Sequence, residues 1–255
     1  ADHLFWMSRY IERAENLARL LDVTWQMSLV PQPEEAANQS WHAIIALNSL
    51  EAAFAAKHAT VNGENVLQFM VSDPDNLSSI YSCLRMAREN AHAVRGTLTT
   101  EMWETLNATW LEARGKSFEQ IVHNGIGEYF EWVKLRSSLS RGVTMGTLLQ
   151  DESYHFIRLA TLLERADNTA RLLERVAEAT TGTVVLNRED PRIARFASAV
   201  PEGTGVRYFG LAPELRRFFP SDDDMQTTVA EEAASVAGNG RPSANDRAQQ
   251  EPAGT

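Results

Sequence analysis

One charged motif occurs twice in this chain. Residues 10–21 read Tyr-Ile-Glu-Arg-Ala-Glu-Asn-Leu-Ala-Arg-Leu-Leu and residues 162–173 read Leu-Leu-Glu-Arg-Ala-Asp-Asn-Thr-Ala-Arg-Leu-Leu, so that eight of the twelve positions are identical. The shared side chains include carboxylates, guanidinium groups and an amide, which can form ion pairs, exchange protons or bind a charged ligand. A repeat maintained only for packing would keep its apolar positions alone. The motif therefore indicates a duplication that carries a charged surface.

Two interpretations of this repeat are open. In each copy an acidic residue precedes an arginine by four positions, and such a pair contributes about 0.2–0.5 kcal/mol on a solvated helix face. Alternatively, two pseudo-symmetric helices meet along a charged seam, where Glu12 and Glu164 pair across with Arg9, Arg13 or Arg165. The candidate residues for binding or for an interface are Arg9, Glu12, Arg13, Glu15, Asn16, Arg19, Glu164, Arg165, Asp167 and Arg171.

A second candidate set lies in a middle helix and consists of Arg85, Arg88, Glu89, Asn90 and Arg95. At 100° per residue, Arg88 and Arg95 fall close to the apolar side of that helix, so we expect both to be partly buried. A buried guanidinium group needs an acidic partner. The pattern predicts either a structural ion-pair network or an anion site for phosphate or carboxylate. The expected acidic partners are Glu12, Glu15, Glu164 or Glu104.

Two Glu-x-x-His spacings, Glu89–His92 and Glu152–His155, invite comparison with carboxylate-bridged di-metal bundles. Only Glu152 and His155 project with the apolar side of their helix, so the alternative metal site consists of Glu12, Glu152 and His155. We instead expect no metal and no other cofactor. In that interpretation Asp151 and Glu152 complement the start of a helix, and His155 is a hydrogen-bonded core residue.

The residues that carry these motifs fall in helical patterns. Apolar residues recur at three- and four-residue spacing from residue 3 to about 178, which predicts an all-α bundle of about seven helices over residues 1–178. Expected helices include residues 39–57 and one long segment over 117–141. Residues 179–220 contain two β-like runs around a short helix and are expected to form a βαβ-like appendage. Residues 221–255 are acidic, poor in aromatics, and predicted to be disordered.

Composition limits the classes of partner. The net charge of −10 and a pI near 5.1 argue against a nucleic-acid partner. The chain has no run of 18 apolar residues, so we expect no membrane span. A single cysteine, Cys83, cannot form an internal disulfide and fits a cytoplasmic location; we expect Cys83 to be a packing residue. Oligomeric state does not follow from these numbers.

Four blocks in order resemble the alpha-E domain family, which is bacterial and all-helical. They are residues 5–19, 82–90, 101–107 and 151–167. This resemblance implies association with ATP-grasp-type amide ligases and with transglutaminase-like proteins, and hence with peptide synthesis or modification. The resemblance implies no specific reaction.

The chain departs from that family after the second motif. Family members normally continue with another helical stretch, whereas residues 185–191 and 206–211 here resemble a short piece of the ATP-binding domain of Mur-type amide ligases. The chain has no Gly-x-x-x-x-Gly-Lys-Ser/Thr loop for phosphate binding. We therefore expect a truncation or fusion product here, without ATP binding of its own.

Together these patterns favour a non-catalytic accessory protein of an ATP-grasp-type peptide ligase system. In that role the charged helix face would dock the ligase or hold a charged peptide. Two rivals are a metal-binding helical-bundle enzyme and a purely structural helical protein, in which the charges only specify how the bundle closes.

Overall fold

The structure, a computed structural model, describes residues 1–187 and 191–209. The chain divides into two compact units, Ala1–Arg171 and Leu172–Thr255, which are described separately. The predicted disordered tail, residues 221–255, lies outside the described residues. In the described part of the chain, no helix is both long enough and apolar enough to cross a membrane.

Residues 1–179 form nine α-helices, of which seven have nine or more residues, so the predicted all-α bundle is confirmed. The helices are α1 (Asp2–Ser28), α2 (Glu34–Leu47), α3 (Glu51–Ala55), α4 (Gly63–Val71), α5 (Ile80–Ala93), α6 (Thr100–Arg114), α7 (Phe118–Asn124), α8 (Ile126–Thr147) and α9 (Glu152–Ala179).

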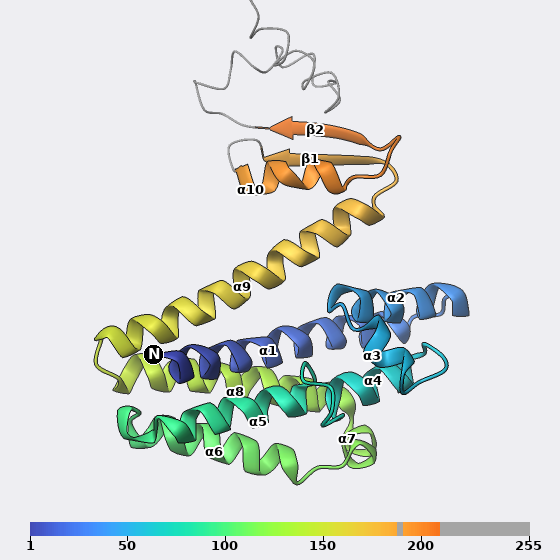
Figure 1. Cartoon of the computed structure of the whole chain (residues 1–255). Coiled ribbons are helices and arrows are strands. Elements are labelled where there is room, and N and C mark those ends of the chain that lie inside the picture. The colour runs from blue at the N-terminus through green and yellow to red at the C-terminus, as the bar shows by residue number, and fades with distance from the viewer. Residues whose placement is uncertain (188–190, 210–255) are drawn as a thin grey trace, which may run out of the picture. The chain divides into compact units, whose positions relative to one another are not determined.

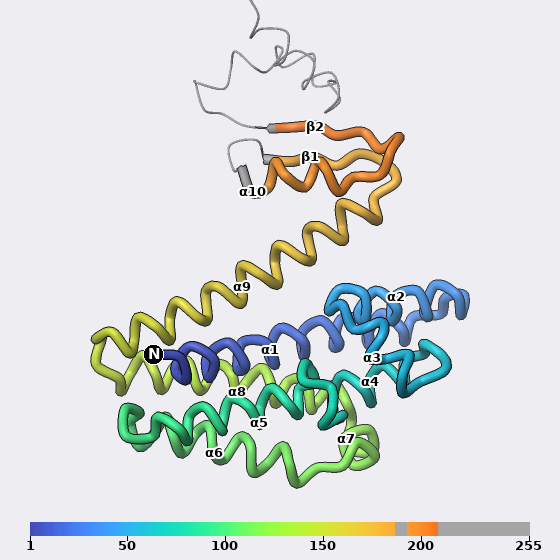
Figure 2. The backbone as a smooth tube through the Cα atoms, in the orientation of Figure 1, coloured from blue at the N-terminus to red at the C-terminus, as the bar shows by residue number. Residues whose placement is uncertain are grey.

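Helix α1 is the central element of the first unit. It packs along α5 on one side and α8 on another, and α6 covers both of these neighbours (Figure 1). Its apolar residues recur every three or four positions and are buried, and Ala14 and Ala18 are fully inaccessible. Small residues at these positions let the neighbouring helices approach closely. The trace in Figure 2 shows α1 running beside α5 and α8.

Two segments that we predicted as single helices are each divided. The 117–141 segment breaks at Gly125, whose φ of 101° lies in the left-handed region that glycine favours. This turn separates α7 from α8. The 39–57 segment ends its first helix at Leu47, and Ser49 takes a positive φ of 54° before α3 begins. In both places a local backbone turn interrupts an otherwise helical apolar pattern.

Side-chain caps determine where several helices begin. Ser117 and Gln120 form a capping box at the start of α7. Thr99 caps α6 by accepting a hydrogen bond from the Met102 N–H. Asp151 accepts from the Tyr154 N–H at 3.2 Å and so opens α9 as predicted.

The repeat is buried unequally in its two copies. In α1, Met7 and Ile11 belong to the core, whereas the residues at the equivalent positions of α9, Leu159 and Leu163, are exposed. On α9 the burial concentrates around Ile157, Ala160 and Glu164. The first unit therefore covers both sides of α1 and only one side of its part of α9.

The second unit contains a small α/β arrangement, as predicted. Strand β1 (Thr183–Asn187) pairs in parallel with β2 (Gly205–Phe209), and Thr183 lies opposite Gly205. Helix α10 (Pro191–Ala194) and a 3-10 turn (Arg195–Ala199) connect the strands. Of the segments that resemble a Mur-type ligase, residues 188–190 and 210–211 lie outside the described residues.

Candidate functional site

The two copies of the motif form ion pairs with each other. Arg165 of α9 binds Glu12 of α1 through two nitrogens, with Nε–Oε1 at 2.6 Å and Nη2–Oε2 at 3.3 Å. Arg13 of α1 binds Glu164 of α9 in the same way, at 2.7 and 3.1 Å. The glutamate of each Glu-Arg dipeptide thus accepts hydrogen bonds from the arginine of the other copy. The predicted pairing of Glu12 and Glu164 across a seam is confirmed.

Each of these two carboxylates also accepts a hydrogen bond from a second arginine. Arg9 donates to Glu164 Oε2 at 2.6 Å. Arg141, from α8, donates to Glu12 at 3.2 Å and also to Glu15. Arg19 holds the other side of Glu15, with Nη2–Oε1 at 2.7 Å. All three glutamates of this charged cluster (Glu12, Glu15, Glu164 and their arginines) therefore bind two guanidinium groups.

Arg141 is a member of this cluster that the sequence did not reveal. It follows three serines on α8 and belongs to no repeat, and two of the serines, Ser137 and Ser138, orient its guanidinium group at 2.9 and 3.1 Å. No spacing within α8 indicates that its partners lie about 126 residues away. Only the packing of α8 on α1 creates this contact.

The three carboxylates lie inside the bundle, with side-chain exposures of 3–5%. Burial alone would raise the pKa of Glu15, but hydrogen bonds from Arg141, Ser137 and Arg19 lower it to about 2. Burial alone would lower the pKa of Arg13, because it disfavours the charged guanidinium group, but the hydrogen bond to Glu164 raises this pKa above its usual value. Broken pairs of this kind cost about 3–5 kcal/mol, so the cluster specifies how the helices meet.

This burial corrects one expectation. The predicted charged face for docking is not available at Glu12, Glu15 or Glu164, because their carboxylates are enclosed by arginines. The side chains of three arginines at the edge of the charged cluster remain partly accessible: Arg19, Arg165 and Arg171. The carboxylates themselves support helix pairing.

A polar cavity of about 230 Å³ lies beside the cluster, entirely within the first unit. Both repeat copies contribute to it, since Asn16 and Asn168 occupy equivalent positions. The Asn16 Nδ2 group is buried and, in the described part of the chain, has no hydrogen-bond partner. Two arginines and two acidic residues balance the formal charge of the lining. The lining residues are Arg13, Asn16, Leu17, Leu20, Leu47, Asn48, Ser78, Glu164, Asp167, Asn168 and Arg171.

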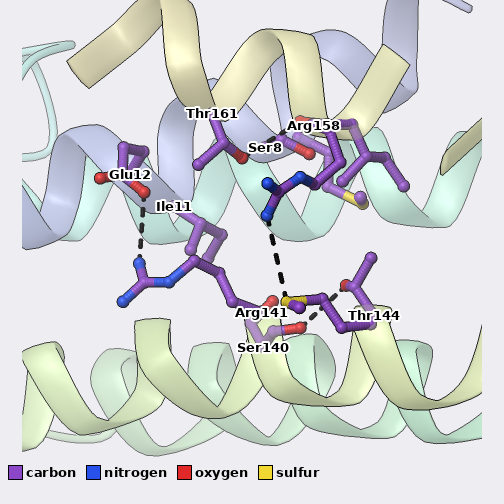
Figure 3. A pocket seen from close by; sticks show the side chains of 11 residues that line it. Ser8, Ile11, Glu12, Ser140, Arg141, Thr144, Arg158 and Thr161 are labelled. Atoms are coloured by element: carbon purple, nitrogen blue, oxygen red, sulfur yellow. Dashed lines mark hydrogen bonds and ion pairs between the residues drawn. The ribbon is translucent and has the colours of Figure 1, made fainter. Parts of the chain in front are cut away.

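A smaller cavity of about 30 Å³ lies between α1, α8 and α9 (Figure 3). Glu12 and Arg141 face each other on one side of it, and Arg158 reaches from α9 toward the Met145 sulfur at 4.0 Å. The volume suits about one water molecule. It offers no room for a peptide or a nucleotide.

The second candidate set does not join the charged cluster. Arg88 is partly buried as predicted, but it pairs with its neighbour Glu89 at 2.9 Å and with Asn107 at 3.2 Å. The expected partners Glu12, Glu15, Glu164 and Glu104 were therefore wrong. Arg88 and Arg95 both lie against the ring of Trp103, at 5.2 and 5.1 Å from its centroid.

Arg95 is exposed, contrary to prediction, and it stacks on Trp103 at 5.1 Å. Asn90 bonds with His3 at 2.9 Å, and no bond or ion pair of Arg85 occurs among the described residues. The middle helix ends at Ala93, so the helical projection no longer applied to Arg95.

The alternative metal residues are not brought together. Glu152 and His155 are both exposed, and the predicted core position of His155 was wrong; its ring contacts Tyr154 edge-on at 5.7 Å. Glu12 is engaged by arginines. Among residues 1–187 and 191–209, no group of three or more His, Cys, Asp or Glu side chains has the geometry to hold a metal ion.

Cys83 is fully buried in α5, as expected for a packing residue. Burial raises the pKa of its thiol to about 12. The group is therefore a thiol at neutral pH, and its position against the core removes it from nucleophilic chemistry.

These features define a helical bundle closed by reciprocal Glu-Arg pairs. The chain belongs to the Alpha-E family, described as a predicted alpha-helical domain with a conserved ER motif, whose model matches residues 1–195. The Glu12–Arg13 and Glu164–Arg165 dipeptides fit that description. No curated protein and no solved structure matches the chain.

Proposed function

We propose that this protein is a non-catalytic partner of an ATP-grasp-type amide ligase system and that it holds a peptide in the polar cavity between its two motif copies. The observation that carries the proposal is the cavity itself, to which both repeats contribute an asparagine. The ligase association is what membership of the Alpha-E family implied from sequence. Cys83 as the only cysteine favours action in the cytoplasm.

The chemistry of the cavity suits a peptide. A peptide end carries amide, carboxylate and ammonium groups, and the lining offers the amides of Asn16, Asn48 and Asn168 together with the partly exposed Arg171 and Asp167. The buried Asn16 Nδ2 lacks an acceptor, and an unsatisfied buried donor destabilises a protein by about 1–3 kcal/mol. A peptide carbonyl would supply that acceptor. The cavity volume of about 230 Å³ accommodates one or two residues of a peptide rather than a folded partner.

A direct test is calorimetric titration with L-alanyl-L-alanine and with its acetylated, amidated form. We expect Asn16→Leu and Asn168→Leu to remain folded and to weaken binding of the free dipeptide about tenfold or more. Asn38→Leu is the matched control, since Asn38 is also half-buried and lines none of the cavities described above. Equal binding by wild type and Asn16→Leu would remove the cavity from the proposal.

The partner role has its own test. An ATP-grasp-type ligase from the same genome is co-expressed with the tagged full chain, and the complex is isolated by affinity purification. We expect the ligase to co-purify at near-equal stoichiometry and Arg19→Gln/Arg171→Gln to reduce its recovery, because these arginines remain accessible at the edge of the cluster. Absence of co-purification with every such ligase of that genome would contradict the partner role.

A further inference from the structure

A groove of about 790 Å³ lies at the end of the first unit where α1, α2, α4 and α7 converge on the start of α8. It shares no residue with the charged cluster or with the polar cavity. Its lining residues are Trp25, Ser28, Trp41, Gly63, Glu64, Leu67, Gln68, Phe118, Glu119, Val122, His123, Gly125, Ile126 and Gly127. The volume is that of a typical small-ligand site.

The tryptophans of this groove differ from the other four. Trp6 stacks with Arg9, Trp103 with Arg88 and Arg95, and Trp132 with Lys116 at 4.6 Å. Trp110 packs against a tyrosine ring. Trp25 and Trp41 have neither a cation nor an aromatic ring against them among the residues described. Cations thus lie against three of the six indoles, and the two indoles that have neither a cation nor a ring against them line the same groove.

The charge of the lining is acidic. Glu64 lies on α4 and Glu119 on α7, both are exposed, and the lining contains no lysine or arginine. His123 is its other titratable residue. An indole face beside carboxylates attracts an ammonium or guanidinium group, with about 0.5–2 kcal/mol from the ring alone. The groove therefore favours a cation that carries an apolar stem.

The start of α8 does not reverse this preference. The partial positive charge of a helix N-terminus would favour an anion near Gly125. Glu128, in the first turn, folds back over this end; a Cβ built on Gly125 would stand 3.7 Å from its Cγ. Its carboxylate offsets the helix dipole locally. An anionic ligand would meet the two glutamates of the lining, with Glu128 beside the helix start.

One further group indicates what the cation is attached to. Trp41 is 3% exposed, and its indole N–H has no hydrogen-bond acceptor among the residues described. The Nε1 atom lies against Gly63, where an added Cβ would come within 3.0 Å of it. Among the described residues Asn16 Nδ2 is the one enclosed side-chain nitrogen or oxygen without a partner, so the Trp41 N–H is accessible from the groove. A ligand that supplies a carbonyl oxygen at this point would satisfy it.

We propose that this groove binds a lysine or arginine residue of a peptide, with the cation between Trp25 and the two glutamates and a peptide carbonyl on the Trp41 N–H. Simple organic cations share the charge but lack the carbonyl. The proposal stands apart from the function proposed above, since the two sites share no residues.

The test is a titration of the full chain with acetyl-trilysine amide, followed by tryptophan fluorescence and calorimetry. We expect Glu64→Gln/Glu119→Gln to raise the Kd about tenfold, which corresponds to about 1.4 kcal/mol. The control, Glu101→Gln/Glu104→Gln, removes the same charge from two exposed positions of α6 outside the groove. Its Kd should stay within about twofold of wild type. Trp25→Leu should weaken binding of this peptide and leave binding of the dipeptide at the polar cavity unchanged, because Trp25 lines only the groove.

Three outcomes would overturn the proposal. Equal weakening by the two double variants would mean general attraction to a chain of net charge −10. Equal affinity for acetyl-triglutamine amide would exclude cation recognition. Equal affinity for spermidine would remove the carbonyl contact, and with it the assignment to a peptide.

Discussion

Glu15 and Asp167 occupy the same position of the repeat in different surroundings, which permits an internally controlled experiment. The Glu15 side chain is 3% exposed and that of Asp167 is 39% exposed. The pKa of Glu15 falls from 4.5 to about 2, a difference of about 2.5 units. At 1.36 kcal/mol per unit, ionised Glu15 contributes about 3 kcal/mol to the free energy of unfolding at neutral pH. Asp167, in a solvated pair with Arg171, should contribute less than about 1 kcal/mol.

We therefore expect Glu15→Gln to lower the free energy of unfolding by about 3 kcal/mol at pH 7, and Asp167→Asn by less than about 1 kcal/mol. Denaturant unfolding followed by tryptophan fluorescence measures both, since all six tryptophans lie in the first unit. Because the folded-state pKa of Glu15 is depressed, its contribution is complete above about pH 4.5 and disappears as the pH falls toward 2.

At pH 3 the difference between wild type and Glu15→Gln should accordingly shrink to about 1.5 kcal/mol. Equal destabilisation by Glu15→Gln and Asp167→Asn at pH 7 would refute the argument from burial. So would a difference between wild type and Glu15→Gln that stays constant from pH 7 to pH 3.

Three further predictions concern Glu12, Cys83 and Lys57. Glu12→Gln alone should cost about 3–5 kcal/mol, and the combination with Arg165→Met should cost clearly less than the sum of the single changes; additivity in denaturant unfolding would show that the two side chains act separately. Cys83 should react with Ellman's reagent only after unfolding, because it is buried and its pKa is raised to about 12; rapid labelling of the native protein at pH 7 would contradict this. Lys57→Met should leave the free energy of unfolding nearly unchanged, because its ammonium group is exposed in its pairs with Asp73 and Asp75; clear destabilisation in denaturant unfolding would show that these pairs support the loop before α5.

Periodicity and the repeat were sufficient to predict the bundle and the pairing of Glu12 and Glu164. Apolar spacing reports the helices directly, and two copies of a charged motif on them indicate a pairing across the seam. The role of Arg141 could not be predicted from the sequence, because this residue belongs to no repeat and reaches its partners only through the packing of α8 on α1. Such a contact has no local signal.

Helical projection did not predict correctly which side chains of α9 are buried. His155 lies with the apolar residues of α9, but that side of α9 is uncovered in the first unit, so the residue is exposed. A projection identifies which side of a helix is apolar and leaves open whether another helix covers it. The groove around Trp25 and Trp41 was missed for a related reason, because five separate segments build it.

The ion pairs between α1 and α9 also affect when the bundle can close during synthesis of the chain. Glu12 and Glu15 leave the ribosome early, yet Arg141 and Arg165, which neutralise them, follow more than 120 residues later. Until then, closing the bundle around α1 would bury carboxylates without their partners, at a cost of several kcal/mol. Closure of the core is thus a late event of synthesis. A chain arrested before α9 could still pack α5 and α8 against α1, but it would lack Arg165 and leave Glu12 without that guanidinium partner, as a partly closed bundle that chaperones and proteases can recognise.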